Sequence, residues 1–188
     1  MLFRSIDDEY TWKIQTNDIL WHKERLLNLI SKKVPVKYKK IIWMDADVFY
    51  KDDSWIDKTS ESLNRYKIVQ PFSKCIYLDK FGNVLINNRI GLVYGYKNTP
   101  KDFRVWNYNS GFAWAAKREF FENFGLFDRG ILGSGDGFMV NTFTKNATFD
   151  LYVERFKWNE HIVKDYLNWS IPVINYIGDD IGYIDAEI

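Results

Sequence analysis

The feature that most constrains the fold is a short apolar run, Ile41-Ile42-Trp43-Met44, which ends abruptly at Asp45-Ala46-Asp47. Residues 17–30, ahead of it, carry apolar side chains at helical spacing, and Asn17 or Asp18 can cap the start of such a helix. An apolar run that follows a helix is typical of a strand buried on both faces, as in a parallel sheet. The run therefore predicts a β-strand inside a layered α/β fold.

The rest of the chain continues this alternation of strands and helices. We expect further strands at residues 68–72, 111–116, 172–177 and 183–188, and further helices at residues 54–65, 117–124, 138–145 and 155–168. Residues 76–86 alternate around Phe81-Gly82-Asn83, which predicts a hairpin, whereas residues 87–108 lack a helical period and predict a long loop. Because the chain has no repeat or Gly/Ser linker, we expect one α/β domain over residues 1–188, with a mixed, mostly parallel sheet flanked by helices.

Composition excludes several classes of protein. Apolar residues make up 46% and charged residues 27% of the 188, so disorder is not the main state. A net charge of +1 argues against nucleic acid as the main partner. The single Cys75 cannot form an internal disulfide, and we expect it to be an inert core residue. No apolar run reaches the length of about 18 residues that spans a membrane, and the N-terminus does not resemble a signal peptide. A cytoplasmic protein without a membrane span is the resulting expectation.

Aromatic residues are unusually frequent, at 18% of the chain with eight Trp. A core of this size does not need so many, so we expect some to line a groove in which flat, amphipathic ligands stack. Trp114, beside Gly111 and the small residues of its strand, is a candidate for stacking on a sugar face. The alternative is that Trp114 belongs to the core.

The first candidate site is the Asp45-Ala46-Asp47 triplet. Ligands in open α/β sheets bind at the carboxyl ends of strands, where this triplet is expected to lie. Two carboxylates one residue apart can face one hard cation, and Mg²⁺ or Mn²⁺ prefers oxygen ligands together with phosphate oxygens. The alternative is a pair of loop carboxylates that cap a neighbouring helix.

The second candidate is Asp136, which stands in a glycine-rich segment, residues 130–137. Gly133, Gly135 and Gly137 allow a ligand to approach the backbone closely and leave little bulk over the acid. A carboxylate held rigidly in this way can serve as a general base. Alternatively, the segment is a flexible turn in which Asp136 caps the following helix.

A polar and aromatic cluster, Trp21-His22-Lys23-Glu24, opens the first expected helix. Lys23 could reach a diphosphate from this position. The alternative is a solvated helix face.

These segments, in this order, resemble a glycosyltransferase of the GT-A fold, similar to the family 2 type. Residues 40–49 resemble the strand and D-x-D motif that holds the metal and the nucleotide-sugar diphosphate. Residues 109–121 with 125–128 resemble the segment that lines the donor sugar and acceptor, and residues 133–136 resemble the glycine-rich stretch whose aspartate is the base of inverting members. Trp21-His22-Lys23-Glu24 with Asn28 is similar to a branch of uncharacterised glycosyltransferase-like proteins.

The resemblance implies a Mn²⁺- or Mg²⁺-dependent transfer from a nucleotide-sugar donor to a hydroxyl of a carbohydrate or glycan acceptor, with inversion. It assigns the metal to Asp45 and Asp47 and the base to Asp136. The donor would contact Asp45, Lys23, Gly111 and Trp114.

Three departures from the family pattern limit this assignment. The chain has little room before Asn17 for the two βα units that bind the nucleotide in the family, Gly135 stands where the family usually has an acid, and neither histidine matches the late metal ligand of many relatives. We therefore expect a partial domain that lacks most of the N-terminal nucleotide-binding units, in which a partner chain or homodimer could complete the sheet.

Two other classes of function stay open. The chain could be a catalytically inactive remnant of this fold that binds a sugar or a partner. It could also be a nucleotidyltransferase, although the glycine-rich, basic nucleotide loop expected near the start of such an enzyme is not visible.

Overall fold

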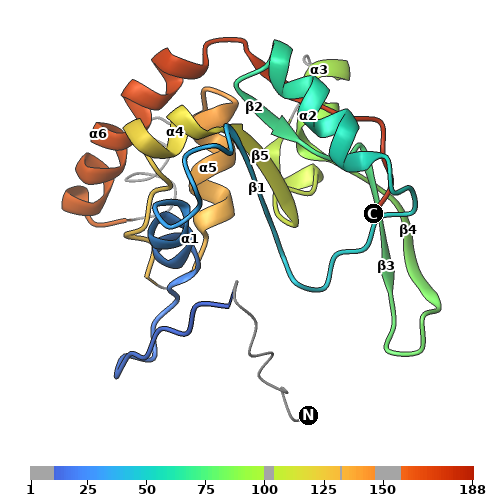
Figure 1. Cartoon of the computed structure of the whole chain (residues 1–188), viewed down its shortest axis with the longest axis horizontal. Coiled ribbons are helices and arrows are strands. Elements are labelled where there is room, and N and C mark those ends of the chain that lie inside the picture. The colour runs from blue at the N-terminus through green and yellow to red at the C-terminus, as the bar shows by residue number, and fades with distance from the viewer. Residues whose placement is uncertain (1–10, 100–103, 132, 147–157) are drawn as a thin grey trace.

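The computed structural model describes residues 11–99, 104–131, 133–146 and 158–188. They form a mixed α/β fold with one four-stranded and one two-stranded sheet (Figure 1). The larger sheet has the order β1-β5-β2-β6, with β1 at Lys40–Met44, β5 at Ala113–Lys117, β2 at Ile68–Gln70 and β6 at Ile181–Tyr183. The strands expected from the apolar runs near residues 41, 68 and 111 are confirmed.

The expectation of a mostly parallel sheet is wrong. Strand β5 runs antiparallel to both of its neighbours, β1 and β2, and only the β2–β6 pair is parallel. The run Ile41–Met44 was expected to be buried on both faces, but β1 is an edge strand in which only Trp43 is buried and Met44 is exposed. The strand buried on both faces is β5, in which four of five residues are buried. Burial on both faces follows from helices covering the sheet and does not determine strand direction, so the sequence pattern could not reveal it.

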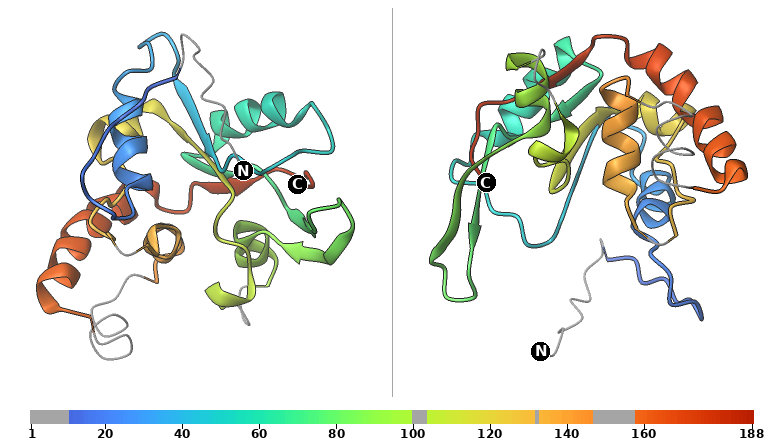
Figure 2. Two further views of the ribbon diagram at one scale, coloured as in Figure 1. Left: turned by 90° about the horizontal axis from the view of Figure 1, so that it is seen from below. Right: turned by 180° about the vertical axis from the view of Figure 1, so that it is seen from behind.

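Helices cover both faces of the four-stranded sheet, and alternate strand residues point to opposite layers. On one face, Val69 and Ala115 pack with Leu63 of helix α2 (Trp55–Arg65). On the other face, Trp114 and Ile68 belong to a larger core. That core includes residues of α3 (Leu92–Asn98), α4 (Arg118–Asn123), α5 (Gly135–Phe143) and α6 (Glu160–Ile177), which lie on the side of the sheet away from α2 (Figures 1 and 2).

Two segments differ from the sequence expectations. Residues 172–177, expected as a strand, form the last turns of α6, which continues through Pro172. Buried Val163, Tyr166, Val173 and Ile177 recur at helical spacing, so packing of this face outweighs the break that proline would otherwise favour. The expected loop over residues 87–108 contains the end of a strand, helix α3 and a short 3₁₀ helix at Val105–Asn107.

The expected hairpin is confirmed and projects from the body of the molecule (Figure 1). It pairs β3 (Lys74–Leu78) with β4 (Val84–Ile90), and Gly82 at its turn has a φ of +85°. The strand expected at residues 183–188 is wrong in position, because β6 lies at Ile181–Tyr183. Beyond Tyr183, an isolated bridge joins Glu187 to Lys74.

The first helix, α1 (Lys23–Ser31), begins several residues later than expected. None of the helices in the described residues is long and apolar enough to cross a membrane.

Candidate functional site

The acidic triplet lies in the turn after β1, at the end of the sheet where the neighbouring strand β5 begins. The backbone N–H of Asp45 donates a 2.7 Å hydrogen bond to the carbonyl oxygen of Phe112. Phe112 has a φ of +72°, a conformation that costs a non-glycine residue free energy and persists where its surroundings require it. The start of β5 thereby holds Asp45, while Asp47 lies exposed on the turn.

The glycine-rich segment presents Asp136 in the first turn of α5. Ser134, at the N-cap, has a φ of +66°, and Gly133 before it has a φ of +100°. This left-handed turn lets the helix begin at Gly135, a few residues earlier than the expected start at residue 138. Asp136 therefore projects from an ordered helix start.

Lys23, the first residue of α1, brings the two acidic segments together. Its Nζ lies 2.7 Å from Oδ1 of Asp45 and 3.7 Å from Oδ1 of Asp136. The three side chains are 25%, 31% and 34% exposed, so they face solvent while being partly shielded from it. The structure thus places three of the predicted site residues, which are distant in the sequence, around one ammonium group.

Gly111 is part of the same cluster. A Cβ added to Gly111 would lie 2.8 Å from Oδ2 of Asp136. This is closer than a real Cβ approaches another atom, so the carboxylate occupies the space that the glycine leaves open. The resemblance assigns Gly111 to contact with the donor. In this structure the space beside Gly111 is filled by the Asp136 carboxylate.

The pKa values of the cluster reflect burial and mutual charge. Burial raises the pKa of Asp136, and the nearby charge of Asp45 adds to this, although Lys23 acts in the opposite direction. Burial by itself would lower the pKa of Lys23, but the hydrogen bond to Asp45 and the charges of both aspartates outweigh it and raise that pKa. Lys23 is therefore held as a cation, while Asp136 takes up a proton more readily than an exposed aspartate.

Glu24 was not among the predicted site residues, yet it lies directly behind Asp136. Its side chain is only 4% exposed, and a Cβ at Gly135 would overlap its carboxylate. Burial raises the pKa of Glu24, and the charge of Asp136 contributes to the rise. In the family that the sequence resembles, the residue before the base is usually acidic, whereas here it is Gly135. The Glu24 carboxylate lies against Gly135 and so supplies a negative charge near Asp136. The sequence marked Glu24 only as a member of the Trp21-His22-Lys23-Glu24 cluster and assigned it no role of its own, because a glutamate in the first turn of a helix resembles an ordinary exposed residue.

Trp114 lies in the core, which corrects the expectation that its ring lines a sugar site. It is 1% exposed, and its Nε1 donates a 2.8 Å hydrogen bond to the carbonyl oxygen of Ser110. Its ring meets Phe143 edge-on at a centroid distance of 5.2 Å. Strand β5 is covered by α5 on this face, so the ring has no face open to a ligand.

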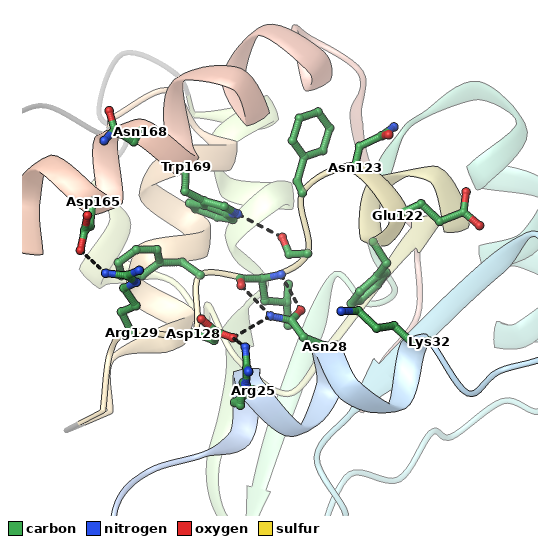
Figure 3. Close-up of a pocket in the computed structure, with 15 residues that line it drawn as sticks. Arg25, Asn28, Lys32, Glu122, Asn123, Asp128, Arg129, Asp165, Asn168 and Trp169 are labelled. Carbon is green, nitrogen blue, oxygen red and sulfur yellow. Dashed lines mark hydrogen bonds and ion pairs between the residues drawn. The ribbon is translucent and has the colours of Figure 1, made fainter.

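A set of hydrogen bonds fixes the position of α1, and hence of Lys23 and Glu24. Asn28 accepts a 2.7 Å hydrogen bond from the N–H of Leu126 and donates a 2.9 Å bond to its carbonyl oxygen. Arg25, one turn earlier, pairs with Asp128 at 2.9 Å. Figure 3 shows both side chains reaching from α1 to the segment between α4 and α5, at a cavity of about 560 Å³. This clasp joins the two segments that carry Lys23 and Asp136.

The acidic pair was expected to hold Mn²⁺ or Mg²⁺. Within the described residues, no three His, Cys, Asp or Glu side chains are grouped to hold a metal ion. Mg²⁺ is commonly held by one or two carboxylates together with substrate phosphates and water, so a pair of carboxylates on an exposed turn fits a metal that arrives with a diphosphate. Asp47 is the freer of the two, because Asp45 is paired with Lys23.

Comparison of this chain with protein-family models, with curated proteins and with solved structures finds no match.

Proposed function

We propose that the chain is a GT-A-like, metal-dependent glycosyltransferase that moves a sugar from a nucleotide-diphosphate donor to an acceptor hydroxyl with inversion. The observation that carries the proposal is the placement of Lys23 between Asp45 and Asp136. Asp45 follows a strand and Asp136 opens a helix, and Lys23 lies at ion-pair distance from both carboxylates. In the proposal, the Asp45 side of this cluster faces the diphosphate and the Asp136 side faces the attacking hydroxyl.

In this proposal, Asp47 and Asp45 hold Mn²⁺ or Mg²⁺ against the diphosphate. The metal would supply Lewis-acid stabilisation of the negative charge that develops on the leaving diphosphate. The Lys23 ammonium would add positive charge next to the same group, since its raised pKa keeps it protonated. Release of the diphosphate from Lys23 would restore the pairing with Asp45.

Asp136 is the proposed general base. The acceptor hydroxyl gives its proton to the Asp136 carboxylate as its oxygen bonds to the anomeric carbon. The bond from that carbon to the diphosphate oxygen breaks, and its electron pair leaves with the diphosphate. Attack opposite to the leaving group inverts the anomeric configuration. The pKa of Asp136 is raised toward neutral pH, which makes the carboxylate a better acceptor of the hydroxyl proton.

A second candidate function is sugar binding without transfer, as in an inactive remnant of the fold. The hydrogen bond between Lys23 and Asp45 favours it, because one of the two proposed metal ligands is already neutralised. This candidate predicts sugar binding that does not depend on a divalent cation.

A thermal-shift screen separates the two candidates. The chain would be heated with uridine, guanosine, thymidine and adenosine diphosphate sugars, each with and without Mn²⁺. A ligand at 100 times its Kd stabilises the native state by about 2.7 kcal/mol, so a true donor should raise the Tm clearly only when Mn²⁺ is present. A shift with a nucleotide sugar that is equal with and without Mn²⁺ would contradict the metal-dependent transferase and support the second candidate.

A further inference from the structure

Trp21 stands immediately before α1 and is tied to the glycine-rich segment. Its backbone N–H donates a 3.1 Å hydrogen bond to the carbonyl oxygen of Ile131. Its side chain is nevertheless 53% exposed. A large aromatic ring is therefore held at the surface by an ordered backbone.

The exposed ring borders a cavity of about 340 Å³ next to the proposed base. The wall is built from the residues around the starts of α1 and α5: Trp21, Lys23, Glu24, Gly133, Ser134, Gly135 and Asp136. One side of the cavity is thus aromatic, while Asp136, Lys23 and Ser134 offer charged and hydroxyl groups. The three small residues of the glycine-rich turn leave the space between these sides open.

Glu24 links the ring to the interior of the site. A hydrogen bond from the Trp21 side chain is among the interactions that stabilise the ionised Glu24 carboxylate. Glu24 itself is buried and packs against Gly135. A buried carboxylate that accepts a hydrogen bond from an exposed indole limits the orientations of that ring.

We infer that this cavity is the acceptor-sugar site and that Trp21 is the surface on which the acceptor pyranose stacks. A pyranose has an apolar C–H face and a rim of hydroxyls, and it matches a cavity with one aromatic side and several polar groups. Stacked on Trp21, the sugar presents a hydroxyl to Asp136. The inference deepens the proposed function and rests on it for the identity of the sugar as acceptor.

Trp12 provides a matched control for exposure alone. It belongs to the same segment ahead of α1 and is 44% exposed, but it does not line the cavity. If any exposed indole of this chain bound sugars nonspecifically, Trp12 and Trp21 would contribute alike.

The test is ligand-observed NMR of the full chain with a panel of methyl glycosides of glucose, galactose, mannose, N-acetylglucosamine and xylose. At least one glycoside should bind the wild type, and Trp21→Ala should weaken its binding by about tenfold, the loss expected for removing a stacking ring. Trp21→Phe keeps a ring and should bind within about threefold of the wild type. Trp12→Ala should bind unchanged. Thermal unfolding of each variant checks its fold, and Trp21→Gln replaces Trp21→Ala if the latter does not fold.

The same variants separate this inference from the proposed function. Mn²⁺-dependent binding of a nucleotide sugar should be equal in the wild type and in Trp12→Ala. Its absence from both proteins would count against the transferase, whereas the glycoside titrations would still decide the role of Trp21. Equal glycoside affinity in the wild type and Trp21→Ala, or no binding of any glycoside to the wild type, would overturn the inference.

Discussion

Gly111 and Asp136 lie so close together that a methyl group on Gly111 would be 2.8 Å from Oδ2 of the aspartate. Gly111→Ala must therefore move the carboxylate or the turn that leads into β5. A misplacement of about 1 Å can cost on the order of 10² in rate, so we expect a loss of this order in the kcat for sugar transfer. Steady-state kinetics with a donor identified by the thermal-shift screen measure it.

Gly137→Ala is the matched control for this substitution. Gly137 lies one residue from Asp136 on the same helix, and a Cβ there would have no atom within 4 Å. Alanine is the better helix former by up to about 1 kcal/mol, so this variant should be at least as stable as the wild type and equally active. Equal kcat values for Gly111→Ala and Gly137→Ala would show that the contact with Asp136 has no role in the reaction.

The proposed roles of the two acidic segments predict different defects. Asp136→Asn keeps the size of the side chain but removes the base, and we expect transfer to fall by about 10²–10⁴ with donor binding retained. Asp47→Ala should lose both transfer and Mn²⁺-dependent donor binding, because the metal contributes to holding the diphosphate. Calorimetric titration of nucleotide sugar in the presence of Mn²⁺ distinguishes them. Equal loss of donor affinity in both variants would contradict the assignments.

The sequence predicted the members of the site better than it predicted the sheet. The resemblance assigned Asp45, Asp136, Lys23 and Gly111 to one site, and the structure brings these four together. Of the other two members of the predicted site, Trp114 lies in the core and Asp47 lies exposed on the turn after β1. The antiparallel pairing of β5, which was not expected, is part of the reason that the four residues meet. It places the beginning of β5 beside the end of β1, so that Phe112 can bond Asp45 and Gly111 can adjoin Asp136. If β5 ran parallel to β1, it would begin beside the start of β1, at the opposite end of the strands from Asp45.

The residues that sequence reasoning missed depend on contacts between distant segments. Glu24 is buried only because Gly135 leaves room for its carboxylate, and neither residue carries a local sign of this pairing. Trp114 was proposed from the sequence as the residue that stacks on a sugar, whereas Trp21 was assigned no such role. Their exposure is decided by α5, which covers Trp114 and leaves the segment before α1 open. Tertiary packing, and not local pattern, selects between such candidates.

The buried Glu24 carboxylate predicts a pH-dependent stability. Its pKa is raised in the folded protein above the ordinary value of 4.5, so the native state holds its proton more tightly than the unfolded chain does. The resulting stabilisation is complete below the ordinary pKa and is lost as the pH rises through the raised pKa. Glu24→Gln removes this dependence, since glutamine stays neutral.

Thermal unfolding of the wild type and Glu24→Gln over a series of pH values tests this. The Tm of the wild type should fall relative to that of the variant as the pH rises from 4 toward neutrality. Asp165→Asn is a control, because Asp165 forms an exposed ion pair with Arg129 and does not line the cavity that Glu24 borders. If the Tm difference between the wild type and Glu24→Gln does not change with pH, or changes in the opposite direction, burial does not disfavour the charge of Glu24.

The clasp at Asn28 should control both the stability of the fold and the geometry of the site. Asn28→Ala removes two hydrogen bonds to the backbone of Leu126, a residue that is only 2% exposed. Each bond contributes about 0.5–1.5 kcal/mol, so we expect the free energy of unfolding to fall by about 2 kcal/mol.

Urea denaturation with an unchanged m-value measures this loss. Asn168→Ala is the matched control, since Asn168 is exposed on α6 at the rim of the same cavity (Figure 3), and its loss should change stability by less than about 0.5 kcal/mol. Asn28→Asp should be as destabilising as Asn28→Ala, because a carboxylate can accept from the Leu126 N–H but cannot donate to its carbonyl oxygen, and it adds a charge near Asp128. If Asn28→Asp retained wild-type stability, the donated bond to Leu126 would not contribute to the clasp, and the position of α1 would have to depend on the Arg25–Asp128 pair.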